Sequence, residues 1–166
     1  GLAENTLVLF FSDNGGMTTF GVGGADNAPL RGGKGETFEG GIRVVSAIRW
    51  PGHLEPGGRM EQIMSVMDVF PTLATAAGIE VGAEKPLDGI DMLPAISEGR
   101  KAEREGYLVF ASEIPRHGSF KLTAFNEEWK LVQLVEQDIQ STSVQNMLFR
   151  LGEDPYEYND LASAHP

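Results

Sequence analysis

The sequence predicts an α/β fold in which the tail of a mostly parallel sheet is followed by a small antiparallel β-sheet. Three observations support this prediction. An apolar run at residues 6–11 is typical of a strand buried on both faces, as in the middle of a parallel sheet. A helical pattern covers residues 65–77. After about Gly106, four short β-rich runs follow one another closely, which is typical of an antiparallel meander.

The elements of the first part are separated by loops. Residues 12–41 are rich in glycine and have no sustained period, which indicates a long loop. Loops of this length inside a compact domain are usually functional. Residues 44–50 form a second apolar, β-branched run. In the predicted helix Asp68 is the expected N-cap, and Gly78 follows as the stop.

The β-rich part begins after a charged linker at residues 97–105. A tight polar connection joins the two middle runs, as in a hairpin. The four predicted strands are Tyr107–Ala111, Phe120–Phe125, Trp129–Val135 and Met147–Leu151. We therefore expect two domains, with residues 1–105 as the C-terminal part of an α/β domain and residues 106–166 as an antiparallel C-terminal subdomain.

The overall composition excludes several classes of function. A net charge of −11 argues against a nucleic-acid groove, which requires a basic face. It does not exclude small anionic substrates, because a metal ion and one or two local cations can outweigh the global field. The chain has no cysteine, so it holds no disulfide, thiolate zinc site or cysteine nucleophile. No apolar run approaches 18 residues, so no membrane span is expected.

The beginning of the chain favours a fragment. The sequence has no initiator Met and no signal-peptide pattern, and it enters the apolar run within six residues. A domain rarely opens on a fully buried strand. We therefore expect an N-terminal part of the same protein to precede Gly1.

The first apolar run leads into Ser12, Asp13 and Asn14, which are followed by Gly15 and Gly16. Ligand sites in α/β folds lie at the carboxyl ends of parallel strands. One charged and one neutral oxygen ligand suit a hard cation such as Ca²⁺ or Mg²⁺, and the glycines would let the backbone pass close to a ligand. The same four residues also suit an ordinary turn. Two side-chain ligands are too few for a metal site, so others must come from elsewhere.

Lys34 lies between two glycines, where a bare backbone can present it to an anion. The P-loop pattern does not fit, because Gly35 stands where that motif needs Ser or Thr and Ala28 where it needs Gly. A surface lysine in a glycine-rich loop explains Lys34 equally well. Glu39 and Arg43 flank the same loop, and we expect them to form a structural ion pair.

For the other polar residues of the sequence we expect structural rather than functional roles. Asp26 and Asn27 repeat the acidic-amide pair, but no apolar strand precedes them, so we expect a turn. The three histidines, His53, His117 and His165, show no ligand spacing.

Five segments together resemble the sulfatase family of the alkaline-phosphatase superfamily. In chain order they are "LVLFFSDNGG", "PLRGGKGETFEGGIRVVSAIRWPG", "MDVFPTLATAAGI", "LDGIDMLPAI", and "WKLV" with "LFRLGEDPYEYNDLA". They are similar to the C-terminal half of arylsulfatase-like proteins and cover nearly the whole chain. The resemblance implies the C-terminal part of a mostly parallel sheet sandwiched by helices, followed by a small antiparallel subdomain.

The resemblance also implies roles for residues. Asp13 and Asn14 are similar to two of the family's calcium ligands, and Lys34 to the lysine that contacts the sulfate group. The family's nucleophile is a formylglycine made from the Cys or Ser of a Cys/Ser-x-Pro-x-Arg motif. This chain lacks that motif, because in "SEIPR" Pro115 lies three residues after Ser112 instead of two. The nucleophile is therefore expected upstream, and the chain alone is expected to be inactive.

The implied activity is hydrolysis of a sulfate monoester on a small molecule or carbohydrate. The alternatives are a phosphonate or phosphodiester hydrolase of the same superfamily and a non-catalytic anion-binding relative. An unrelated α/β domain with a turn after the first strand is a further alternative. Arg116 and His117 are candidate substrate contacts, and a solvated loop explains them equally well. The resemblance implies a periplasmic, extracellular or lysosomal protein.

Overall fold

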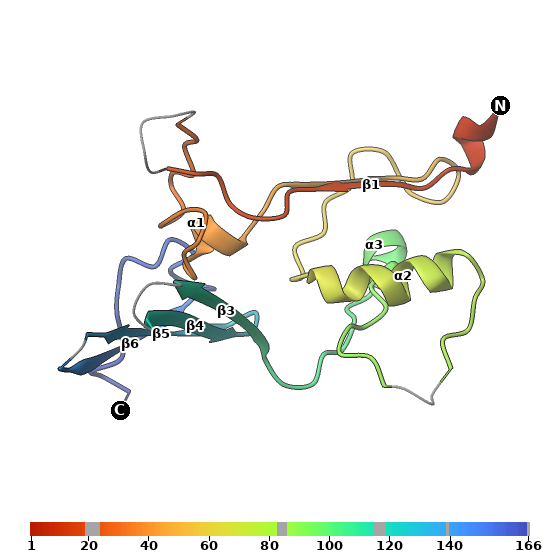
Figure 1. Cartoon of the computed structure of the whole chain (residues 1–166). Coiled ribbons are helices and arrows are strands. Elements are labelled where there is room, and N and C mark those ends of the chain that lie inside the picture. The colour runs from red at the N-terminus through yellow and green to blue at the C-terminus, as the bar shows by residue number, and fades with distance from the viewer. Residues whose placement is uncertain (19–23, 83–85, 115–118, 139, 166) are drawn as a thin grey trace. The chain divides into compact units, whose positions relative to one another are not determined.

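The computed structural model describes residues 1–18, 24–82, 86–114, 119–138 and 140–165. The chain divides into two compact units (Figure 1), Gly1–Leu9 with Ala47–Gly106, and Phe10–Ser46 with Tyr107–Pro166. The elements are η1 (Leu2–Asn5), β1 (Val8–Phe11), α1 (Glu39–Ile42), β2 (Ser46–Arg49), η2 (Val66–Asp68), α2 (Val69–Ala76), α3 (Leu93–Glu98), β3 (Leu108–Ile114), β4 (Ser119–Phe125), β5 (Trp129–Gln137) and β6 (Thr142–Arg150).

The predicted helix is present, and Asp68 holds the expected N-cap position of α2, although its side chain makes no capping bond there. A second cap precedes it, at the short helix η2. Ser65 is the N-cap of η2, and its hydroxyl accepts a hydrogen bond from the Met67 amide. Asp68 returns a bond by accepting from the Ser65 amide, which completes a capping box. The helix α2 ends before Gly78, whose φ of 69° shows the left-handed conformation expected of a helix stop.

Asp68 is the polar centre of the unit that contains α2. Its side chain is fully buried, pairs with Arg104, and accepts a hydrogen bond from the Ile90 amide at 2.9 Å. A buried carboxylate needs this set of partners, because an unpaired charge in the interior is costly. The residue expected to cap one helix therefore also connects that helix to two later segments.

The strand β1 differs from the prediction of a strand buried on both faces in a parallel sheet. Its hydrogen-bonded neighbour is β2, and three of its four residues are exposed. The Ser12 amide, just after β1, donates to the Val45 carbonyl, just before β2. The two strands therefore run antiparallel. A two-stranded ribbon covers neither of its own faces, so the apolar side chains of β1 remain exposed in this chain.

The strands β3–β6 form the antiparallel meander that the sequence predicts, in the order β3-β4-β5-β6 (Figure 1). β6 begins at Thr142, five residues before the predicted start, because its first half is mostly polar and gives no apolar signal. The pairing of Gln137 with Thr142 shows that backbone hydrogen bonding carries β6 beyond its apolar segment.

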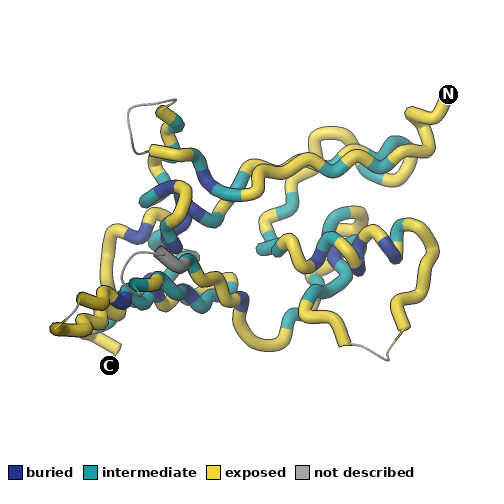
Figure 2. Tube along the Cα trace, viewed as in Figure 1, coloured by how far each residue is buried: buried dark blue, intermediate teal, exposed yellow. Residues whose placement is uncertain are grey.

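One face of this sheet packs on the glycine-rich loop. Phe38, at the start of α1, forms a buried cluster with Val132, Met147 and Phe149. Figure 2 shows the buried stretches of the chain in dark blue. In the sheet Val132 lies opposite Met147. The loop and the C-terminal sheet therefore share a core, and by packing residues 10–46 group with residues 107–166. The expected domain boundary between residues 105 and 106 stays a prediction.

Among the described residues, none of the helices combines the length and the apolar character that crossing a membrane requires.

Candidate functional site

The loop after β1 crosses α1 at very close range. The Gly15 amide donates to the Gly41 carbonyl at 2.8 Å, and Gly15 is buried. A Cβ on Gly15 would overlap the Gly40 carbonyl oxygen, and a Cβ on Gly40 would overlap Gly32. Glycine is therefore required at this crossing by the approach of two backbones rather than by turn geometry.

We expect Gly15→Ala to destabilise the protein by about 3 kcal/mol or more, because the added methyl meets backbone that cannot rotate away. Gly24→Ala is the matched control, since a Cβ there meets nothing within 4 Å. Urea unfolding of the two variants measures the difference. Equal midpoints for both variants would contradict the close crossing.

Asn27 fastens the same loop, a role that the sequence does not reveal. Its side chain accepts from the Gly16 amide at 3.0 Å and donates to the carbonyls of Gly16 and Gly32 at 2.8 and 3.1 Å. The predicted turn is also present, because Asp26 accepts from the Ala28 amide. The residues around Asn27 are typical of a turn, so the sequence predicts only the turn. The bonds from Asn27 to Gly16 and Gly32 could not be predicted, because they depend on the folded path of the chain.

Asp13 and Asn14 come just after β1, separated from it by Ser12. The Asn14 amide nitrogen donates to the Gly15 carbonyl at 2.9 Å, which leaves its Oδ1 oxygen available as a ligand. Ser12 donates to the Asn14 carbonyl and fixes the corner further. Asp13 is exposed, and no hydrogen bond or ion pair engages its carboxylate within the described chain. Two residues adjacent in the chain therefore each have an oxygen available for a hard cation.

Lys34 is tied to this corner through its backbone. Its amide donates to the Gly16 carbonyl at 3.1 Å, only two residues after Asn14. Its side chain is exposed, and in the portion of the chain that is described no carboxylate pairs with its ammonium group. The structure thus brings Lys34 to the same loop cluster as Asp13 and Asn14, with its charge available for an anion.

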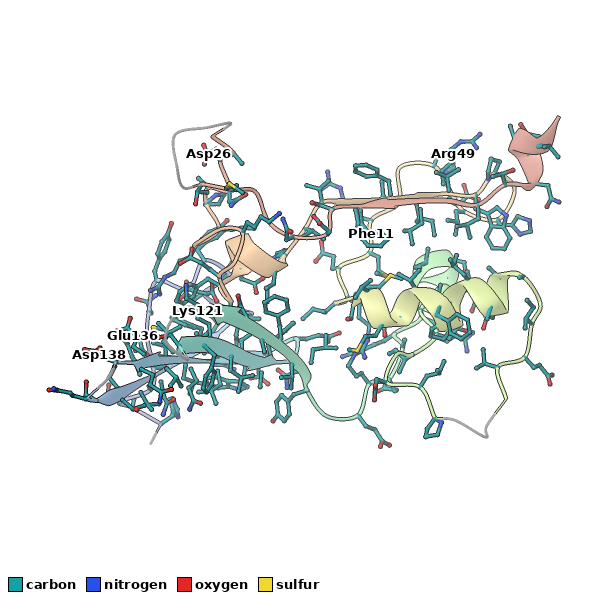
Figure 3. The ribbon with its side chains drawn as sticks, viewed as in Figure 1. Phe11, Asp26, Arg49, Lys121, Glu136 and Asp138 are labelled. Carbon is teal, nitrogen blue, oxygen red and sulfur yellow. The ribbon has the colours of Figure 1, made fainter. Side chains whose placement is uncertain are left out.

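The sheet supports the loop on both sides of Lys34. Glu36 accepts from the Gly33 amide at 3.0 Å and pairs with Lys121 of β4 at 3.5 Å (Figure 3). Ser112 of β3 donates to the Gly35 carbonyl at 3.1 Å. Lys121 and Ser112 lie opposite each other in the sheet, so neighbouring strands hold the loop from one face.

A buried cluster of three charges fastens α1 to the C-terminal segment. The Lys130 ammonium lies 2.9 Å from Glu39 and 2.8 Å from Glu157, and all three side chains are buried. Glu157 also accepts from the Glu39 amide at 2.7 Å. The predicted pair of Glu39 with Arg43 exists, but at 3.8 Å with Arg43 largely exposed. Lys130 is therefore the main partner, which the sequence could not show across 91 positions.

The cluster holds two carboxylates for one ammonium. Burial raises the pKa of Glu157, and the attraction of Lys130 opposes this rise without cancelling it. The backbone of Glu157 has a φ of 60°. Residues other than glycine rarely adopt this left-handed conformation. Its buried contacts hold the residue in this conformation.

Arg31 completes the attachment of the C-terminal segment. Its guanidinium carbon lies 3.9 Å from the centre of the Phe38 ring, and one of its nitrogens donates to the Glu157 carbonyl at 3.1 Å. Arg31 therefore connects the loop before Lys34 both to the core and to the segment that carries Glu157.

Of the residues that the sequence singles out, the structure thus ties the backbone of Lys34 to Gly16, two residues after Asn14. Arg116 and His117 lie outside the described residues. Within the described ranges, no group of three or more His, Asp or Glu side chains could hold a metal ion. Any metal bound at Asp13 and Asn14 therefore needs ligands beyond these.

A sequence model of the sulfatase family matches residues 1–79. The chain is 33% identical to N-acetylgalactosamine-6-sulfatase of Sus scrofa over 181 residues, which covers 98% of this chain and 35% of that protein. It is 46% identical to steryl-sulfatase of Rattus norvegicus over 101 residues, covering 58% of this chain and 18% of that protein.

Solved structures agree with the sequence comparisons. The chain resembles the crystal structure of Ps i-CgsB with a TM-score of 0.78 and 31% identity, over 98% of this chain and 33% of that one. The same protein was also solved in complex with k-i-k-neocarrahexaose. The chain belongs to the sulfatase family. It spans about a third of the length of the relatives that it matches over nearly all of its own length.

Proposed function

We propose that this chain is the C-terminal part of a sulfatase that hydrolyses sulfate esters of carbohydrates. The observation that carries the proposal is the bond between the Lys34 amide and the Gly16 carbonyl. It brings the backbone of Lys34 to the loop that follows Asp13 and Asn14, and the Lys34 ammonium has no carboxylate partner among the described residues. The relative named N-acetylgalactosamine-6-sulfatase, and the neighbour solved in complex with k-i-k-neocarrahexaose, support a carbohydrate substrate.

The donors present suit calcium. Asp13 offers a charged oxygen and Asn14 a neutral one, and the bond from Asn14 to the Gly15 carbonyl orients that amide. Such a cation, when bound, supplies positive charge next to the sulfate oxygens. The ligands that complete its shell come, in this proposal, from the part of the protein before Gly1. Magnesium fits less well, because it demands a stricter octahedral set.

Lys34 stabilises the charge that develops on the sulfate as the S–O bond breaks. Its side chain is exposed at a loop whose backbone is fixed from both sides by Gly16 and by the sheet. A cation that is positioned before the reaction needs little reorganisation during it, and this gives electrostatic catalysis its strength.

The nucleophile belongs to another part of the protein in this proposal. The chain has no cysteine, and "SEIPR" does not match the spacing of the formylglycine motif. The isolated chain should therefore hydrolyse no aryl sulfate even with added calcium. Turnover by the pure chain would contradict this division of roles.

The test uses the complete protein and its Asp13→Asn variant. We expect the variant to bind calcium roughly tenfold or more weakly, because the cation loses a charged ligand. Calorimetric titration with calcium measures this directly. Asp88→Asn is the control, since Asp88 is an exposed acidic residue in a bend of the other unit.

Matched sulfate and phosphate esters of the same phenol decide the reaction class. Faster hydrolysis of the sulfate supports the proposal, and a preference for the phosphate ester favours a phosphohydrolase. Equal calcium affinities of the wild type and Asp13→Asn would overturn the metal site, and no turnover on either ester would favour a non-catalytic relative.

A further inference from the structure

A shallow hollow of about 380 Å³ opens beside the glycine-rich loop. It is lined by Thr18, by residues 26–32 and by Tyr158. Asn27 and Gly32 line the hollow and also form the bond that fastens the loop, and Gly32 lies two residues before Lys34. The hollow and the candidate site are therefore built on the same loop backbone.

Two charged side chains that line the hollow, those of Arg31 and Asp26, can still bind a ligand. Arg31 binds a carbonyl and lies over a ring, yet no carboxylate pairs with it in the described part of the chain. Asp26 (Figure 3) uses one oxygen for the Ala28 amide, which leaves the second oxygen to accept. A free guanidinium charge suits an anionic group, and a carboxylate oxygen suits hydroxyl donors.

The aromatic part of the hollow is equally available. Tyr158 is 71% exposed, and its hydroxyl lies 3.5 Å from the Pro29 carbonyl on the opposite lining segment. Its ring lies 5.9 Å from that of Tyr156 in a tilted arrangement. An exposed ring anchored at its tip offers an apolar face beside polar groups, a combination that suits a sugar ring.

We propose that this hollow binds the sugar next to the sulfated one in an oligosaccharide, with an anionic substituent of that sugar at Arg31. The proposal rests on the proposed function, which places the sulfated sugar at Lys34. The net charge of −11 repels polyanions as a whole, so local attraction at Arg31 is needed for an acidic neighbour to be accepted. The anion is a carboxylate or a second sulfate.

The test measures binding by the complete protein after metal removal with EDTA, so that hydrolysis does not interfere. The probes are N-acetylgalactosamine 6-sulfate, a chondroitin 6-sulfate tetrasaccharide with a carboxylate on the neighbouring sugar, and an iota-carrageenan tetrasaccharide with a sulfate there. We expect at least one tetrasaccharide to bind roughly tenfold more tightly than the monosaccharide. The tetrasaccharide with the larger gain identifies the anion.

Tyr158→Ala should remove most of that gain and leave monosaccharide binding unchanged. Tyr107→Ala is the matched control, because Tyr107 is 65% exposed and does not line the hollow.

Arg31→Gln should remove the gain as well, and a thermal melt establishes that this variant is folded. No gain in the wild type, or equal losses for both ligand sizes in Tyr158→Ala, would overturn the proposal. Failure of the proposed function appears separately, as no hydrolysis of an aryl sulfate by the calcium-loaded wild type.

Discussion

Replacement of Lys34 by alanine is expected to lower kcat/KM for sulfate-ester hydrolysis by the complete protein by about 10²–10³-fold. The loss follows from the proposed function, in which the Lys34 ammonium stabilises the charge that develops on the sulfate. Its side chain is exposed and carries no structural ion pair in the described chain, so the fold should be unchanged. Steady-state kinetics with an aryl sulfate measures the effect, and a urea midpoint measures stability.

Two further variants make this prediction specific. Lys34→Arg should recover part of the activity, because it restores the charge with a different shape. Arg59→Ala removes an exposed positive charge from the other unit and should leave kcat/KM unchanged. Near-wild-type activity of Lys34→Ala would mean that Lys34 is a surface lysine of a glycine-rich loop.

Replacement of Lys130 by methionine is expected to destabilise the protein by about 3–5 kcal/mol, because it leaves Glu39 and Glu157 buried without a counter-charge. Urea unfolding monitored by fluorescence measures the free energy of unfolding. Lys121→Met is the matched control, since Lys121 lies on the neighbouring strand and pairs with Glu36 at a partly exposed position. That pair should contribute less than about 1 kcal/mol. Equal losses in the two variants would contradict a special role for the buried cluster.

The same cluster predicts a pH dependence with a definite sign. Burial raises the pKa of Glu157, so the folded state holds this proton more tightly than the unfolded state does. The contribution of Glu157 to stability is fully present below the ordinary pKa of glutamate and is lost as the pH rises through the raised value. Relative to Glu157→Gln, which mimics the protonated form, the wild type should therefore become less stable as the pH increases above about 4.5.

The comparison with Glu157→Gln is needed because the chain has 24 acidic residues, and the pH dependence of the wild type alone does not single out Glu157. Unfolding free energies of both proteins across this pH range isolate the single group. A constant difference between them would show that Glu157 titrates normally. Glu36→Gln serves as control, because Glu36 is only partly buried and pairs with Lys121, outside the buried cluster.

The C-terminal sheet was predictable because its strands carry local signals. Four closely spaced β-rich runs, and a tight polar connection between the middle two, predict the meander, and the structure has the same strand order. The start of β6 was missed for a physical reason. Residues 142–146 are paired by backbone hydrogen bonds to β5, and such bonds do not depend on an apolar side-chain pattern.

The first strand shows the opposite limit. An apolar run indicates that a strand prefers burial, but it does not identify the neighbour that would cover it. In this chain β1 has β2 beside it in antiparallel orientation, and its apolar residues remain largely exposed. The apolar run correctly predicted a strand. Its orientation in a parallel sheet could not be predicted, because tertiary contacts decide which strand pairs with it.

The candidate site divides in the same way. The sequence by itself determined the residue types of the site and their local presentation, an acidic-amide pair after a strand and a lysine between glycines. The tertiary structure alone decided that Gly16 bonds to Lys34, that Asn27 fastens the loop, and that Lys130 lies between two carboxylates. Side-chain chemistry and turn preference act over a few residues, whereas these contacts join positions that the chain brings together only when it folds.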